Sequence, residues 1–182
     1  MKTIFKLLGT IVLSIVIFSG CQENPSDPAS VSNDQMSLSK GRIIHHVSVG
    51  GCDIVPPGVD RNFSLVANMD AEGNVSGQWQ DTFGKDELGN DIGRIHVAVD
   101  CLEILEPGNA AIVGGVITHG TVNGEDVSGQ RAATMVEDNG QGHNSDPDRI
   151  SYSYFPVADC GAGIDFELFD IYCGQVKVKN NE

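Results

Sequence analysis

The chain has 182 residues and is strongly acidic, with 25 Asp and Glu residues against 11 Lys and Arg residues and a formal charge of −14. This length favours a single folded domain. So acidic a surface repels phosphate backbones, which excludes nucleic acid as an expected partner, whereas it attracts cations.

The first twenty residues have the pattern of a secretory signal. Lys2 and Lys6 form a basic start, and the apolar run Leu7–Phe18 that follows is too short to cross a bilayer as a helix. The next residues complete the motif Phe18-Ser19-Gly20-Cys21, which resembles the lipobox of bacterial lipoproteins. The resemblance implies cleavage before Cys21, a diacylglycerol thioether on its sulfur and acylation, for example by palmitate, of the new amino terminus. The alternative is an ordinary signal peptide in which Cys21 is incidental.

The segment after the lipobox is polar and rich in Ser, Asn, Asp and Pro. It lacks the apolar residues needed to offset its ordering entropy, so we expect a disordered tether with a reach of about 25 Å. Gln22 is not the aspartate linked to inner-membrane retention in enteric bacteria, so the lipoprotein resemblance favours the outer membrane of the cell envelope. The expected organisation is a signal peptide over 1–20, a lipidated cysteine and tether over 21–40, and a folded domain over 41–182.

Short apolar runs with a period of two residues fill the domain, separated by Gly, Asn, Asp and Pro. Alternation over Phe63–Met69, a turn at Asp70–Asn74 and a restart at Val75–Trp79 predict a hairpin. The remaining candidate strands are Ile95–Cys101, the doubly apolar and therefore central Ala110–His119, Ala132–Val136, Arg149–Phe155 and Phe166–Lys179. Asn123-Gly124 is a tight-turn signal.

This pattern predicts an all-β domain of about seven to eight strands, as a single antiparallel β-barrel or β-sandwich. The 22 glycines suit a closed or strongly coiled sheet. The short sequence V-S-G-Q occurs twice, within Asn74–Gln78 and Asp126–Gln130, each time after a Gly-containing turn. We interpret it as the same local passage from a turn into a strand, used twice; the alternative is a duplicated hairpin.

Three motifs are similar to those of an uncharacterised family of small secreted bacterial all-β domains. They are Gly73–Gly77 (GNVSG), Cys101-Leu102 with Gly108-Asn109-Ala110, and Asp138–Gly142 (DNGQG). The resemblance covers roughly Arg61–Phe155. It implies an all-β fold and a location outside the cytoplasm, and no activity.

Four cysteines remain once Cys21 is assigned to the anchor, and an oxidising compartment would allow them to pair. Cys160 and Cys173 are the favoured pair because they flank a short loop, which leaves Cys52 with Cys101. The competing interpretation keeps Cys101 as a free, buried thiol.

The sequence contains no G-x-S-x-G or H-E-x-x-H motif, so no catalytic residue is assigned. His96 and His119 lie on neighbouring candidate strands and could converge with His46 on a metal ion; the alternative is that a half-polar strand face holds these histidines without such a role.

Calcium is the more plausible ion, because oxygen donors crowd the glycine-containing loop Glu137–Asp148. Asp138, Asp146 and Asp148 are its candidate ligands. A second oxygen-rich cluster consists of Asp81, Asp86, Glu87, Asn90 and Asp91.

The favoured function is therefore a non-catalytic binding or structural module, held to a membrane by lipid and contacting an unknown protein or small ligand. The alternative is a ligand-binding or enzymatic barrel. It would place His96, His119, Trp79 or the carboxylates in a barrel mouth.

Overall fold

The computed structural model describes residues 41–52, 62–140 and 145–181. The predicted signal peptide, Cys21 and the tether lie outside the described residues. The described part of the chain contains no helix long and apolar enough to cross a membrane.

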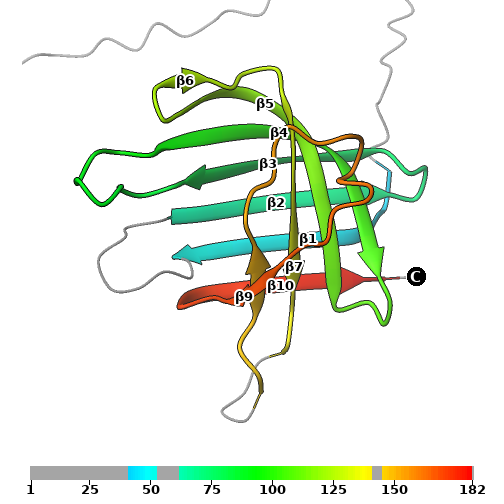
Figure 1. The fold of residues 1–182 in the computed structure, drawn as a ribbon. Coiled ribbons are helices and arrows are strands. Elements are labelled where there is room, and N and C mark those ends of the chain that lie inside the picture. Colours follow the sequence, from blue (N-terminus) through cyan, green and yellow to red (C-terminus); the bar gives the residue numbers. More distant parts are fainter. Residues whose placement is uncertain (1–40, 53–61, 141–144, 182) are drawn as a thin grey trace, which may run out of the picture. The chain divides into compact units, whose positions relative to one another are not determined.

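The domain is one antiparallel sheet that curls strongly into a half-barrel (Figure 1). Its strands are β1 (Ile43–Cys52), β2 (Asn62–Asp70), β3 (Val75–Thr82), β4 (Gly93–Leu105), β5 (Ala110–Val122), β6 (Glu125–Asp126), β7 (Arg131–Glu137), β8 (Arg149–Ser151), β9 (Leu168–Asp170) and β10 (Cys173–Asn180). They are ordered β10-β1-β2-β3-β4-β5-β7-β8-β9, and β6 pairs with β5. In Figure 1, β1 to β4 lie side by side, and β7 crosses them at a steep angle.

The all-β prediction is confirmed. Of the predicted barrel and sandwich, the structure is neither in full: it is one curled sheet that forms a half-barrel. The strand count is higher than predicted because β1 and the two-residue β6 were not among the candidate strands, and because one candidate forms two strands. The predicted strand Phe166–Lys179 is wrong as one element, since it is broken at Ile171 and Tyr172 into β9 and β10.

Period-two alternation builds the core on the inner face of the curl. β2 turns Phe63, Leu65 and Ala67 inward and exposes the residues between them. The largest fully buried side chain, Trp79 on β3, packs at the centre of this core. β5 is buried on both faces for most of its length and lies between β4 and β7, as its doubly apolar sequence predicted.

The hairpins are closed by the predicted turn residues. Asn123 and Gly124 both adopt positive φ, at 51° and 82°, which is the requirement of a type I′ turn.

The two copies of the short repeat do not adopt the same structure. Val75–Gln78 is extended strand, whereas Val127–Gln130 forms a turn with Gly129 at φ 82°. The interpretation as one passage from a turn into a strand, used twice, is therefore wrong.

The cysteines pair across the sheet and not along the chain. Cys52 bonds Cys173 with Cα atoms 5.2 Å apart, because the β1–β10 register places these residues opposite each other. Cys101 bonds Cys160 with Cα atoms 5.7 Å apart. The predicted pairing of Cys160 with Cys173 and the free-thiol interpretation of Cys101 are therefore both corrected.

Candidate functional site

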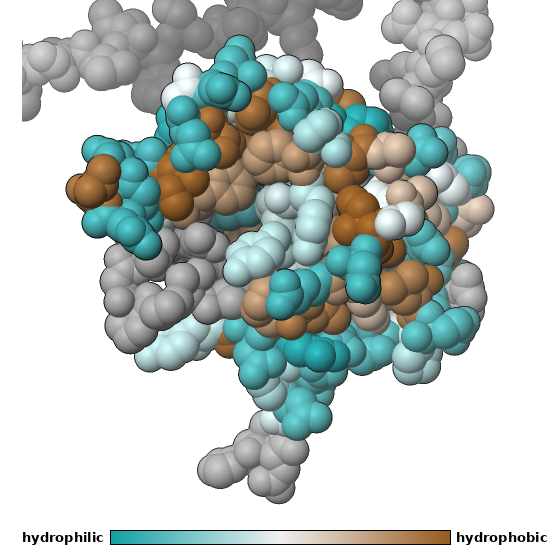
Figure 2. Space-filling view, viewed as in Figure 1, coloured by the Kyte–Doolittle hydropathy of each residue, from teal (hydrophilic) through white to brown (hydrophobic). Residues whose placement is uncertain are grey.

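A recess of about 260 Å³ lies at one end of the half-barrel, where the end of β3, the start of β4 and the end of β5 face the segment after β8. It is lined by Asp81, Phe83, Ile92, Val122, Ser151, Tyr152, Ser153 and Phe155. In the space-filling view, apolar surface gathers around a hollow on this side of the domain (Figure 2).

Asp81 is the acidic residue of this recess, and it is only 5 % exposed. It has the same strand parity as Trp79, so the alternation of β3 turns its carboxylate toward the apolar interior. Its neighbours in register are Phe63 on β2 and Ile95 on β4. A carboxylate in such a position costs solvation energy that hydrogen bonds or a cation must offset.

Ser153 supplies one of these interactions, because its hydroxyl donates to Asp81 Oδ2. The segment that carries Ser153 is fixed to β7: Ala133 N donates to Tyr154 O at 3.0 Å, and Tyr154 N donates to Ala133 O at 2.9 Å. The neighbouring Ser151 is also tied to β7, since its hydroxyl oxygen accepts from Met135 N at 2.9 Å. The polar groups of the recess therefore sit on β3, on β8 and on a segment that is hydrogen-bonded to β7.

Aromatic side chains form its walls. The rings of Phe83 and Phe155 have centroids 6.0 Å apart and are tilted by 34°. Tyr152, which is 43 % exposed, packs on Phe169 with centroids 4.6 Å apart. The recess thus combines one buried carboxylate with a mostly apolar, aromatic surface, a combination typical of small-ligand sites.

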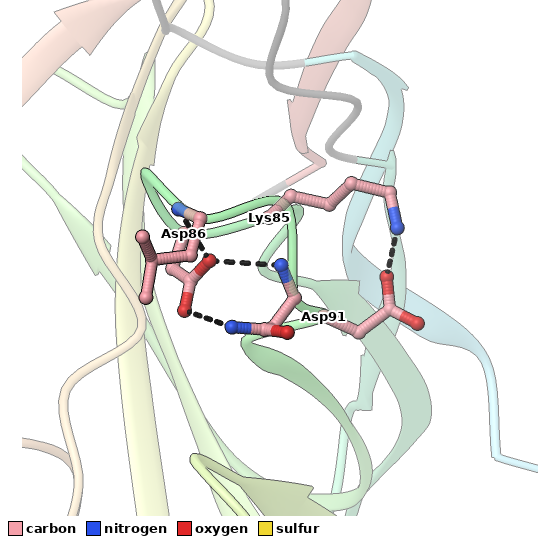
Figure 3. A network of polar contacts seen from close by, with 5 residues as sticks. Lys85, Asp86 and Asp91 are labelled. Carbon is pink, nitrogen blue, oxygen red and sulfur yellow. Dashed lines mark hydrogen bonds and ion pairs between the residues drawn. The ribbon is translucent and has the colours of Figure 1, made fainter.

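The second predicted acidic cluster is not one site. Asp86 closes the β3–β4 hairpin: its Oδ1 accepts from Leu88 N at 2.9 Å and Asn90 N at 2.8 Å (Figure 3). These hydrogen bonds, those from Asn90 foremost, lower the pKa of the Asp86 carboxyl. Lys85 pairs with Asp91 at 2.6 Å on the exposed side of the same loop.

Asp138 and Asp148, two of the candidate calcium ligands, accept hydrogen bonds from backbone N–H groups of β10. Asp148 Oδ2 accepts from Val176 N at 2.7 Å, and Asp138 Oδ2 accepts from Val178 N at 3.0 Å. The third candidate, Asp146, is exposed. Within the described residues no group of three or more His, Cys, Asp or Glu side chains could hold a metal ion, and residues 141–144 of this loop lie outside them. The calcium site stays a prediction.

The structure brings His96 and His119 together but leaves His46 apart. His96 and His119 face each other on the outer surface of β4 and β5. His46 lies on β1, three strands from β4 in the sheet, with its Nδ1 2.7 Å from Asn68 Oδ1. None of the three lines the recess.

Sequence reasoning missed the partnership of Asp81 with Ser153. The sequence does contain one signal: Asp81 occupies an inward-facing position of its strand, two residues after Trp79, where an apolar residue is expected. Its partner was not predictable, because Ser153 is 72 residues away. Comparison of the chain with protein families, curated proteins and solved structures finds no match.

Proposed function

We propose that the protein is a lipid-anchored component of the bacterial cell envelope whose half-barrel is a non-catalytic binding module, with the recess at Asp81 as its ligand site. The observation that carries the binding role is the position of the Asp81 carboxylate, 5 % exposed and lining an otherwise mostly apolar recess. The anchor rests on the lipobox at Cys21 and the signal sequence before it.

The chemistry of the lining defines the ligand. An ionised carboxylate is purely an acceptor, so it selects a cationic or hydrogen-donating group. Phe83, Phe155 and Tyr152 offer apolar contact to the body of the same ligand, and aromatic faces also attract cations. We therefore expect a small molecule or a single side chain with a compact apolar body and an ammonium head.

The hydrogen bond between Ser153 and Asp81 favours binding over nucleophilic catalysis. The serine proton points at a carboxylate, a much weaker base than the imidazole that activates catalytic serines. His96 and His119 lie on the outer face, and Trp79 is sealed in the core. The arrangement is that of a polar anchor for a bound donor.

The acidity of the chain supports the same ligand class. A net charge of −14 attracts cations over a distance of about one Debye length and raises their concentration near the surface. The two disulfides suit an oxidising compartment, in agreement with the proposed location.

The test of binding is titration of the full chain with benzylamine, followed by NMR shifts of Ile92, Val122 and Ser153. We expect saturable binding with a dissociation constant on the order of 1 mM, the range of a small fragment. Benzyl alcohol, which has the same ring without the charge, should bind about tenfold more weakly. Equal shifts with both probes, or none at these residues, would refute the proposed ligand class.

Variants separate the carboxylate from general charge effects. Asp81→Asn should lose the preference for benzylamine, whereas the exposed Asp91→Asn should keep it. Ser153→Ala provides a second readout if Asp81→Asn does not fold. It removes a donor that competes for Asp81, so benzylamine should bind as tightly as in the wild type or more tightly.

The anchor is tested separately by mass spectrometry of the mature protein purified from membranes. We expect an amino-terminal peptide that begins at Cys21 and carries acyl chains, and a Cys21→Ser variant that lacks them. A mature chain that starts elsewhere would remove the lipid anchor from the proposal and leave the ligand site unaffected.

A further inference from the structure

Two imidazole rings stack on the outer face of the sheet, away from the recess. His96 on β4 and His119 on β5 are register partners, with ring centroids 3.9 Å apart and planes inclined by 21°. Imidazole lone pairs lie in the ring plane, so in this stack they run side by side. A rotation of the side chains out of the stack would let both nitrogens reach one ion at the usual metal–nitrogen distance of about 2.0–2.1 Å.

A β-bulge creates this pair. The β4–β5 register shifts between His96 and Val97, so that Val97 pairs with Ile117 and Thr118 is the extra residue. Without the extra residue, strand alternation from the buried Ile117 would point His119 toward the core. The bulge instead exposes both Thr118 and His119.

Thr118 also orients the pair. Its hydroxyl donates to the backbone oxygen of His96 at 3.1 Å, and its oxygen lies 3.4 Å from His119 Nδ1. In the tautomer with the proton on Nδ1, His119 donates to this oxygen and presents the Nε2 lone pair. A hydrogen bond on one ring nitrogen is the usual support of a metal-binding histidine.

The surroundings of His96 favour its neutral form. Burial lowers the pKa of His96, with smaller contributions from His119 and Arg94. The residue paired with His96 on β3 is the uncharged Gln80. Two residues further along the same face, Thr82 pairs with Arg94. On the side of β6, Asp126 lies opposite Thr121, and its carboxylate accepts from Ser128 N at 2.9 Å.

We propose that His96 and His119 bind a divalent late transition-metal ion, of the copper or zinc kind, on the outer face of β4 and β5. Neutral imidazole is a preferred ligand of both ions. The groove above the pair, about 320 Å³ and also lined by Gln78 and Gln80, leaves room for water or an amide oxygen to complete the coordination. This site is independent of the amine site at Asp81.

Titration of the untagged full chain with Cu²⁺ and with Zn²⁺, by calorimetry at pH 7.5, tests the proposal. We expect one ion per chain, with Cu²⁺ bound more tightly than Zn²⁺. Affinity should fall at pH 5.5 because protons compete for the imidazoles, whose ordinary pKa is about 6.5. Nitrogen hyperfine couplings in the Cu²⁺ electron paramagnetic resonance spectrum should indicate two imidazoles.

The chain offers a matched control for this titration. His96→Ala and His119→Ala should each weaken Cu²⁺ binding by about tenfold or more, the range of a lost ligand contact. His46→Ala removes another histidine of the same sheet, one already paired with Asn68, and should leave the affinity unchanged. Equal affinities in the wild type and in both pair variants, or a loss as large in His46→Ala, would overturn the proposal.

Discussion

Asp148 accepts a hydrogen bond from the backbone N–H of Val176 across 2.7 Å, at an edge of β10 that pairs with no other strand of the described residues. Asp138 accepts from Val178 N, two residues further along the same edge, at 3.0 Å. Alternate residues of a strand point their N–H groups the same way, so these two carboxylates substitute for a missing strand. They connect the segment between β7 and β8 to β10.

Replacing either carboxylate should destabilise the domain. Asp148→Ala leaves two backbone donors, Val176 N and Asn139 N, without this acceptor. The expected loss is about 1–3 kcal/mol of unfolding free energy, measured by urea denaturation. The exposed Asp146→Ala, two residues away, serves as the control and should change little. If the two variants unfold at the same urea concentration, Asp148 does not support the edge.

Peptide mapping without reduction should recover Cys52 linked to Cys173 and Cys101 linked to Cys160. The bridges close loops with sequence separations of 121 and 59 residues, so each contributes about 4–5 kcal/mol in the chain-entropy model. Paired serine variants of either bridge should therefore melt at clearly lower temperature. A peptide joining Cys160 to Cys173 would contradict the register of β1 with β10.

Acid should weaken two hairpin turns. Asp70 and Asp86 accept the same three kinds of hydrogen bond, chiefly from Asn74 and Asn90, and these lower both carboxyl pKa values. Because the folded pKa lies below the unfolded one, their contribution is full above the unfolded pKa of about 3.9 and disappears as the pH falls through the folded value.

The measurement is the difference in unfolding free energy between the wild type and Asp70→Ala or Asp86→Ala. This difference should be full at pH 6 and shrink steadily below about pH 4. NMR titration should also place both carboxyl pKa values below 3.8. A difference that is constant across this range would show that the charged form has no special role in the turns.

The single tryptophan provides a probe of the core. Trp79 is fully buried and packs against Phe63, with ring centroids 5.8 Å apart. Its fluorescence should be blue-shifted and resistant to iodide quenching in the folded protein, and both properties should vanish together on unfolding. Efficient quenching under native conditions would mean that the inner face of the sheet is open to solvent.

Local sequence determined the elements of this protein. The alternation of apolar and polar residues predicted which side chains of β2 and β3 are buried, among them Phe63, Leu65 and Trp79. Asn123-Gly124 predicted the tight turn after β5. Both signals depend on neighbouring residues alone. The same alternation placed Asp81 inward, although its meaning was missed. The two-residue β6 escaped prediction because so short a segment shows no period, and the strands predicted at Arg149–Phe155 and Phe166–Lys179 were correct only in part.

The tertiary structure alone decided which distant groups meet. Cys52 reaches Cys173 because β10, the last strand of the chain, pairs with β1. Ser153 reaches Asp81, and Asp148 reaches Val176, because the curl of the sheet brings the residues around β8 to β3 and to β10. Even the His96–His119 pair required a bulge at Thr118 that strand periodicity does not reveal. Periodicity along a chain fixes which face a residue takes, whereas register and curvature, which fix its partner, arise from the packing of the whole sheet.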